Sequence, residues 1–237
     1  MGEKLDHNPI IAALDDMHVS EALNLAHILK GHVWGFKGND LLDEDPYCVV
    51  KLKNVGGVFA DTKFHDTPKT VANRVKKYAS FDPGPDFLSI HASGGIEMMQ
   101  AAVEAANKAE SPIKILAITI LTSHDFDDCL RIYGSSPKDK VVQLTMMAAK
   151  AGVYGVVCSA QELETLAGYK ELKELKRIVP GIGPDWYQKT ASGQKRMMTP
   201  VEAIERGADF LVMGRAITSA ENPVQAAIDT LREIGLA

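Results

Sequence analysis

The feature that most constrains the fold is a regular alternation along the chain between short apolar runs and segments with helical spacing. Runs of this length, rich in Val, Ile, Leu and Phe, predict buried β-strands. Eight of them recur within the 237 residues: Pro9–Asp15, Val33–Lys37, Val58–Lys63, Phe87–Ala92, Ile113–Leu121, Val153–Ser159, Arg177–Ile182 and Phe210–Arg215. The sequence therefore predicts eight strands, most of them separated by helices.

The segments between the runs carry helix signals. Residues 20–31 begin at Ser20, a favoured cap residue, and end at a glycine. Residues 95–110 and 136–152 have apolar residues at helical spacing, and residues 199–207 carry proline in the first turn and glycine after the end. Residues 40–55 are not expected to form one long helix, because Pro46 interrupts them.

Eight strands alternating with helices in a chain of this length predict a (β/α)8 barrel, or TIM barrel, which typically needs about 250 residues. A doubly wound open sheet is the alternative arrangement of the same elements. No linker or low-complexity segment divides the sequence, so we expect a single α/β barrel domain over residues 1–237.

Nearly every predicted strand ends in a polar or ionisable residue. A barrel gathers the C-terminal ends of its strands around one opening, and catalytic residues lie there. The residues at these ends are Asp15, Lys37, Asp61 with Lys63, His91, Thr122 with Ser123, Ser159 and Arg215. We therefore expect one common site at this opening.

Charge is concentrated in residues 61–66 (DTKFHD), directly after a buried strand. Residues two apart on a strand share a face, about 6.6 Å apart, so Asp61 and Lys63 are expected to point the same way. Lys37 ends the preceding strand and is expected beside Asp61. The two lysines and two aspartates, with Asp66 as the second, can form an alternating neutral network, because buried charges are tolerated when paired. Such a network would keep Lys63 protonated as a general acid.

The same residues also have a purely structural interpretation. Asp66 or Thr67 would cap the helix that follows, and Asp61 and Lys63 would form a solvated ion pair. His91 is expected to be packed or hydrogen-bonded at a strand end rather than catalytic.

The last predicted strand ends in Gly214 and Arg215, at the place where barrels often bind phosphate. Glycine permits close approach of the backbone, and arginine offers a planar fork of donors. The alternative is a surface arginine after a turn glycine. Pro184–Lys195 is long and polar for a connector, and we expect it to act as a lid.

Composition excludes several classes of function. The net charge of -5 argues against nucleic-acid binding, which needs a basic patch. The N-terminus lacks a signal-peptide core, and the most apolar run, residues 113–121, is too short to span a membrane. The three cysteines form no C-x-x-C pair, which favours a reduced, cytoplasmic setting. The seven histidines show no metal-binding spacing.

Short motifs occur in a fixed order along nearly the whole chain. They are AALD (12–15), FK (36–37), DTKFHDTPKT (61–70), HASGG (91–95), LTS (121–123), VVCSAQE (156–162), PGI (180–182), GQKRMMTP (193–200) and MGRAIT (213–218). This ordered set resembles the orotidine 5′-phosphate decarboxylase family in its bacterial form. D-x-K-x-x-D alone is shared with related decarboxylases of sugar phosphates.

The resemblance implies decarboxylation of orotidine 5′-phosphate to uridine 5′-phosphate in pyrimidine biosynthesis, with no metal or organic cofactor. Lys63 would protonate C6 of the pyrimidine, and Asp61 would lie near the departing carboxylate and hold Lys63. Lys37 would complete the network and reach the ribose, and Asp15 would bind a ribose hydroxyl. Thr122 would contact the pyrimidine.

For the remaining contacts, the resemblance implies that Gly214 and Arg215 bind the phosphate and that Gln194 bridges phosphate and base. The residues matching Asp66 and Thr70 enter the site of the neighbouring subunit in that family. A homodimer with shared sites is therefore implied.

Four positions depart from the family's usual pattern. Gly38 and Asn39 stand where Val-Gly is usual, Thr67 replaces an isoleucine of an apolar pocket, and Gly183 replaces an arginine at the phosphate end. Two other functions stay open. One is a related phosphosugar decarboxylase, which usually carries glutamate at the position of Lys37 and needs magnesium. The other is a barrel that binds nucleotide without turnover.

Overall fold

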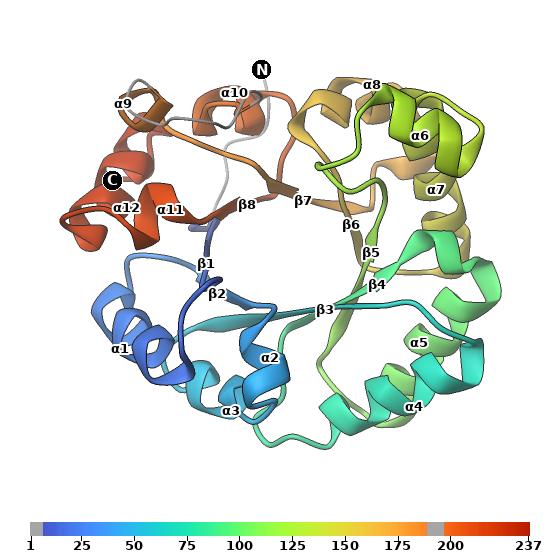
Figure 1. The fold of residues 1–237 in the computed structure, drawn as a ribbon, viewed down its shortest axis with the longest axis horizontal. Coiled ribbons are helices and arrows are strands. Elements are labelled where there is room, and N and C mark those ends of the chain that lie inside the picture. Colours follow the sequence, from blue (N-terminus) through green and yellow to red (C-terminus); the bar gives the residue numbers. More distant parts are fainter. Residues whose placement is uncertain (1–6, 189–196) are drawn as a thin grey trace.

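Eight parallel strands close into a barrel, as the alternating pattern predicts. The computed structural model describes residues 7–188 and 197–237. Each strand pairs with the next in sequence, and β1 pairs with β8 (Figure 1), so the open-sheet alternative is wrong. The strands are β1 (Ile10–Ala13), β2 (Gly35–Gly38), β3 (Gly57–Phe64), β4 (Phe87–His91), β5 (Lys114–Ile118), β6 (Gly155–Val157), β7 (Lys176–Pro180) and β8 (Phe210–Met213).

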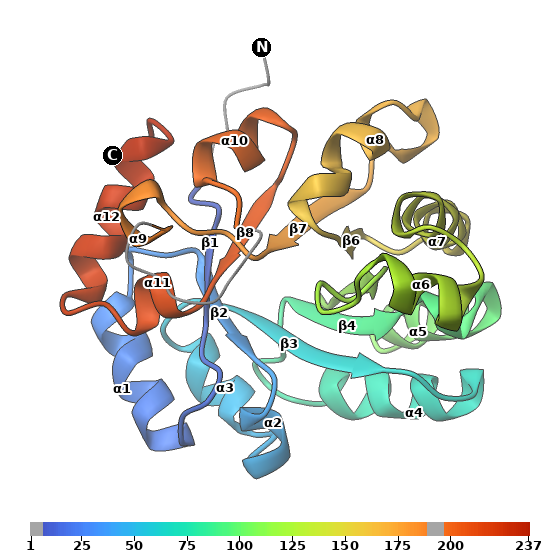
Figure 2. The same ribbon diagram turned by 45° about the horizontal axis from the view of Figure 1, so that its top comes forward.

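Helices surround the barrel on its outer side (Figures 1 and 2). They are α1 (Val19–Leu29), α2 (Leu41–Glu44), α3 (Cys48–Lys53), α4 (Pro68–Ala79), α5 (Ile96–Lys108), α6 (Phe126–Tyr133), α7 (Pro137–Ala151), α8 (Leu163–Ala167), α9 (Asp185–Gln188), α10 (Pro200–Glu205), α11 (Arg215–Thr218) and α12 (Pro223–Glu233). Within the described ranges, no helix has the length and apolar character that crossing a membrane requires.

Local signals explain both ends of α7. The Ser136 side chain accepts the Asp139 N–H at the start of α7, and Gly152 ends that helix with a φ of 77°. The predicted Ser20 cap is wrong: α1 begins at Val19, so Ser20 lies inside the first turn. As expected, residues 40–55 form two short helices on either side of Pro46.

Helix α6 has no counterpart in the sequence prediction. Its apolar residues Phe126, Cys129, Leu130 and Tyr133 follow helical spacing along one side of the helix. Cys129 is buried, whereas Phe126 and Leu130 are exposed. The Asp125 side chain accepts the Asp128 N–H at its start, and Gly134 ends it with a φ of 64°, so the sequence carried helix signals that the prediction overlooked.

Aromatic rings fill the N-terminal end of the barrel interior. The Trp34 ring stacks on Phe87 with centroids 4.8 Å apart and meets the edge of Phe210 at 5.1 Å. Glycine is required at position 57, because a Cβ atom there would lie 2.7 Å from the Trp34 ring. The buried interior cluster is Ile11, Ala13, Phe59, Phe87, Leu116, Ile178, Phe210 and Val212. This packing forms a floor beneath the C-terminal end of the barrel interior.

Candidate active site

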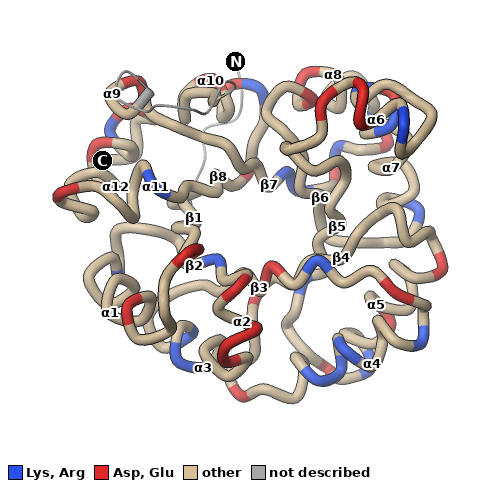
Figure 3. Tube along the Cα trace, viewed as in Figure 1, with Lys and Arg blue, Asp and Glu red and all other residues tan. Residues whose placement is uncertain are grey.

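A cavity of about 580 Å³ opens at the C-terminal end of the strands. Acidic and basic residues alternate around the barrel opening from β1 to β4 (Figure 3). The cavity floor includes Phe59, and its walls include apolar residues from β5, β6, β7 and β8. The polar and charged residues that line it are Asp15, Asp16, Lys37, Asp61, Lys63, Thr122, Tyr187, Arg215 and Thr218. The site thus lies where the barrel prediction placed it.

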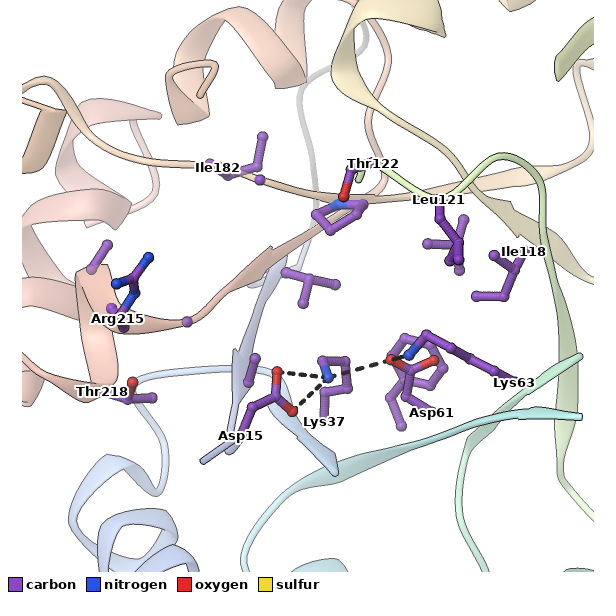
Figure 4. A pocket seen from close by; sticks show the side chains of 18 of the residues that line it. Asp15, Lys37, Asp61, Lys63, Ile118, Leu121, Thr122, Ile182, Arg215 and Thr218 are labelled. Carbon is purple, nitrogen blue, oxygen red and sulfur yellow. Dashed lines mark hydrogen bonds and ion pairs between the residues drawn. The ribbon is translucent and has the colours of Figure 1, made fainter. Parts of the chain in front are cut away.

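Four charged side chains form an alternating chain across one wall of the cavity (Figure 4). The Lys37 Nζ donates to Asp15 Oδ1 at 2.7 Å and Oδ2 at 3.0 Å, and it lies 3.3 Å from Asp61 Oδ2. The Lys63 Nζ donates to the same Asp61 Oδ2. An alternating neutral network was expected, and within one chain its second aspartate is Asp15; Asp66 does not reach the cavity of its own chain.

Burial increases from the ends of this network toward its middle. The side chains of Lys37 and Asp61 are 9% and 7% exposed, whereas those of Lys63 and Asp15 are 32% and 42% exposed. The two outer groups can therefore meet a ligand while the two inner groups hold them in place. A pair of charges this deeply buried is stable only when each has its counterion.

Electrostatics keep both inner groups charged. Burial acts to raise the pKa of Asp61, but the ammonium groups of Lys37 and Lys63 outweigh burial and hold that pKa below its usual value. Burial likewise acts to lower the pKa of Lys37, and Asp61 and Asp15 outweigh it and raise that pKa. Asp61 therefore stabilises the fold above the ordinary carboxyl range, and this contribution is lost as the pH falls through its lowered pKa.

Asp61 is held from both neighbouring strands by uncharged groups as well. The Ser89 Oγ on β4 donates to Asp61 Oδ1 at 2.8 Å, and the Asn39 side chain after β2 donates to the Asp61 carbonyl oxygen at 2.7 Å. Asn39 is one of the departures from the family pattern, and its amide now has a defined partner. The carboxylate therefore has no freedom to turn away from the lysines.

Asp61 and Lys63 point the same way into the cavity, as predicted, but β3 carries a bulge where they lie. Ala60 pairs with Leu88 and Phe64 with Ile90, so residues 61–63 of β3 oppose Ser89 alone. Lys63 adopts a φ of 47°, in the left-handed region. A non-glycine residue held there costs about 1–3 kcal/mol, and such strain persists only where neighbouring contacts enforce it.

Arg215 lies across the cavity from the charge network (Figure 4). It is exposed at the start of α11, and it has no ion-pair partner among the residues that the structure describes. Gly214 precedes it, and a Cβ atom there would meet nothing closer than Ala13 Cβ at 4.0 Å. This wall therefore offers an unpaired cation beside open backbone.

Gly183 cannot be replaced by arginine without rearrangement. A Cβ atom at this position would lie 2.8 Å from the sulfur of Met197 and 3.4 Å from a ring carbon of Tyr187. The Gly183 N–H donates to the Met198 carbonyl at 3.0 Å. The departure at position 183 is therefore matched by methionine and tyrosine side chains that occupy the space.

Two predicted site residues, Asp66 and Thr70, lie outside the cavity of their own chain. Asp66 is exposed beyond β3, accepts the Thr67 N–H at 2.7 Å and lies 3.5 Å from Arg74. Thr70 meets the Thr67 hydroxyl at 3.0 Å at the start of α4. Thr67 occupies the cap position of that helix, yet its side chain makes no capping bond.

The other predicted strand-end residues divide between the cavity and its surroundings. Thr122 lines the cavity, whereas Ser123 and Ser159 do not. His91 also lies outside the cavity, with its ring 5.4 Å from that of His65, and burial lowers its pKa. Of the predicted lid Pro184–Lys195, residues 189–195, Gln194 among them, lie outside the described residues.

Sequence reasoning missed Ser89, Asp16 and Tyr187 as site residues. A sequence signal existed for Ser89, because it is a polar residue between the apolar residues of a predicted buried strand. The structure shows that it is fully buried. Among the described residues, no group of three or more His, Cys, Asp or Glu side chains is arranged to hold a metal ion.

Comparisons with known proteins point to one family. A family model described as "Orotidine 5'-phosphate decarboxylase / HUMPS family" matches residues 8–229. An orotidine 5′-phosphate decarboxylase from Paramagnetospirillum magneticum is 38% identical over 238 residues, covering 97% of this chain and 99% of that protein. One from Dichelobacter nodosus is 40% identical, covering 94% and 96%. A crystal structure of the Lactobacillus acidophilus orotidine 5′-phosphate decarboxylase matches with a TM-score of 0.80 at 30% identity, covering 97% and 100% of the two chains.

Proposed function

Because the chain belongs to the orotidine 5′-phosphate decarboxylase / HUMPS family, we propose that it converts orotidine 5′-phosphate to uridine 5′-phosphate and CO2. The observation that carries this proposal is the Asp61–Lys63 pair on the cavity wall. It sets an ammonium donor beside a buried carboxylate that accepts its hydrogen bond. Such a pair can deliver a proton where negative charge develops.

In the proposed reaction, the bond between C6 of the pyrimidine and its carboxylate breaks, and the electron pair stays on C6. The Lys63 Nζ donates a proton to C6, and solvent water then reprotonates the lysine. Asp61 lies next to the departing carboxylate and orients Lys63. Ile118 and Leu121 stand on the same side of the cavity as Lys63 (Figure 4), and an apolar wall favours neutral CO2 over a charged carboxylate.

The rest of the cavity suits the remaining parts of the nucleotide. Asp15 and Lys37 would bind ribose hydroxyls, and Thr122 would contact the pyrimidine. Gly214 and Arg215 would bind the phosphate, as would Gln194 in the family pattern. Support comes from the position of Arg215, which lines the cavity across from the network. Binding energy from the phosphate can help to organise the reacting end.

We propose that the reaction needs neither metal nor organic cofactor, because Lys63 supplies the proton and C6 keeps the electrons. The direct test is the loss of orotate absorbance on adding orotidine 5′-phosphate, with and without chelator, and with product identified as uridine 5′-phosphate. Turnover that resists chelator is expected. Chelator-sensitive turnover of another phosphorylated carboxylate would instead favour a phosphosugar decarboxylase. Binding of nucleotide without turnover would favour a regulatory barrel.

We further propose a cytoplasmic homodimer in which Asp66 and Thr70 complete the partner's site. Both residues lie outside the cavity of their own chain at the end of β3 and the start of α4, which supports this assignment. Lys63→Ala and Asp66→Ala proteins should each be inactive. Mixing them and allowing subunits to exchange should restore up to about a quarter of wild-type activity, because half of the dimers are mixed and each has one intact site.

A labelled-subunit exchange assay is the control for that mixing experiment. Proof of exchange without any recovery of activity would exclude a shared site. Sedimentation of the wild-type protein at assay concentration gives the subunit number independently.

A further inference from the structure

Ser89 is the one serine within an otherwise apolar part of β4. It is fully buried, and its strand neighbours Leu88 and Ile90 are buried too. A hydroxyl inside an apolar layer costs free energy unless both its donor and its acceptor are used. Its contacts therefore show what it is used for.

Both functions of the Ser89 hydroxyl are satisfied by the pair at the cavity wall. Its Oγ donates to Asp61 Oδ1 at 2.8 Å and accepts the backbone N–H of Lys63 at 3.0 Å. The first bond leaves Asp61 Oδ2 facing both lysines. The second fixes the backbone from which the Lys63 side chain extends. One side chain thus holds the carboxylate and the ammonium-bearing residue together.

The bulge explains why this bond is needed. Residues 61–63 oppose Ser89 alone, so the regular ladder between β3 and β4 is interrupted there. The Ser89 Oγ receives the Lys63 N–H at this point, and the Thr62 hydroxyl donates to the Ser89 carbonyl at 2.8 Å. Lys63 stays in a left-handed conformation, with a φ of 47°. Such a conformation persists only where surrounding contacts enforce it.

We propose that Ser89 is a positioning residue that holds the Asp61–Lys63 pair in its reactive arrangement. Ser89 does not line the cavity, so it acts through these two residues and does not touch the substrate. The expected effect of Ser89 on kcat rests on the proposed function. The hydrogen bonds from Ser89 to Asp61 and Lys63 do not depend on that function, and they can be tested without turnover.

The kinetic test compares Ser89→Ala with Thr62→Val. The first removes both hydroxyl bonds to the pair; the second removes a bond between the same two strands and leaves the pair's contacts intact. Ser89→Ala should lower kcat about 10- to 100-fold with KM within about 3-fold, and Thr62→Val should keep kcat within about 3-fold. An unchanged kcat in Ser89→Ala, or an equal loss in both variants, overturns the proposal.

A binding test separates positioning from general loosening. Uridine 5′-phosphate should bind Ser89→Ala within about 3-fold of wild type, because the groups that line the cavity are retained. An analogue with a negatively charged oxygen at C6, which places charge beside Lys63, should bind about 10- to 100-fold more weakly. Equal weakening of both ligands would mean a merely structural role.

A third measurement does not depend on the reaction. Hydrogen exchange at the Lys63 amide should accelerate at least about tenfold in Ser89→Ala and stay unchanged in Thr62→Val. Ser89→Cys, which keeps a similar volume with a weaker donor, replaces the alanine variant if that variant does not fold. Wild-type protein without turnover would refute the proposed function, whereas unchanged exchange at Lys63 would refute the role of Ser89.

Discussion

At the N-terminal end of the barrel interior the space is filled by stacked aromatic rings, whereas at the C-terminal end it is bounded by paired charges. Strand β3 joins the two: Phe59 belongs to the interior cluster and forms part of the cavity floor, and Asp61, two residues on, lies in the charge network. Alternate residues of one strand thus serve packing and chemistry in turn.

The two ends of the barrel interior stabilise their buried side chains in different ways. Rings need only shape and apolar surface, and Phe87 contacts several of them at once. Buried charges need counterions and hydrogen-bond donors, and Asp61 has two lysines and a serine. We therefore expect changes at the floor to affect stability and changes in the network to affect catalysis. Four experiments can break or sharpen that division.

The largest expected effect is on catalysis, from Lys63→Ala. The variant should lose about 10⁴-fold in kcat, because both the proton donor and the charge beside C6 are removed. Its stability should change little, since Asp61 keeps Lys37 at 3.3 Å. Turnover of orotidine 5′-phosphate and thermal melting measure the two quantities.

The matched control for that variant is Lys53→Ala. Lys53 pairs with Asp86 at 2.6 Å, near the start of β4 at the opposite end of the barrel. It should lose at most about 1 kcal/mol of stability and keep its activity. Comparable losses of activity in both lysine variants would contradict the division between the ends.

Phe87→Ala should have the largest effect on stability. Removing a ring from this floor should cost about 3–5 kcal/mol of unfolding free energy, which lowers the melting temperature by about 6–20 °C. Below the new transition, kcat should stay within about 3-fold of wild type. Phe87→Leu fills most of the space and should cost about 1 kcal/mol. A large fall in kcat in folded Phe87→Ala would show that the floor also positions the network.

Glu162, which follows β6 at the C-terminal end of the barrel, offers a test of how a partly buried carboxylate behaves outside the lysine network. Burial raises its pKa to about 7 from 4.5, against opposing hydrogen bonds from backbone amides and the Ser159 side chain. The fold therefore favours the neutral acid. The stability this contributes is present below pH 4.5 and is lost as the pH rises through 7.

Glu162→Gln should accordingly match wild-type stability near pH 4 and exceed it by about 3 kcal/mol near pH 8. Melting temperatures across that range measure the difference. The exposed neighbour Glu164, changed to Gln, should leave stability unaltered at both pH values. A constant difference between Glu162→Gln and wild type at every pH would show that burial does not penalise this charge.

Arg215→Ala should have the smallest effect of the four. Loss of one charged donor to a phosphate should raise KM about 10- to 100-fold and leave kcat nearly unchanged. Binding of uridine, which lacks the phosphate, should not change. Arg232→Ala, which removes an exposed ion pair to Asp229 on α12, is the control. A fall in kcat with KM preserved would place Arg215 in the reacting end instead.

Strand positions and the polar character of their ends were predictable from local pattern. All eight predicted runs contain strands, and Asp15, Lys37, Asp61 and Lys63 meet in one cavity. The prediction failed for Ser20 as a cap, because α1 begins one residue earlier, and it overlooked α6, although apolar spacing, an aspartate cap and a final glycine mark that helix. Sequence reasoning did not foresee that Asp15 pairs with Lys37 within one chain, because the two residues are 22 positions apart.

By itself, the sequence determined the order of strands and helices and the gathering of charge at the strand ends, because hydrophobic period and composition are properties of short segments; closure of the barrel was shown only by the pairing of β1 with β8. Tertiary structure alone decided that Asp15 completes the network, that Ser89 holds Asp61 and Lys63, and that Met197 occupies the space beside Gly183. These contacts depend on the register between strands, above all on the bulge in β3. In a closed barrel the register must also satisfy the stagger that closure of the whole sheet requires, which no single segment shows.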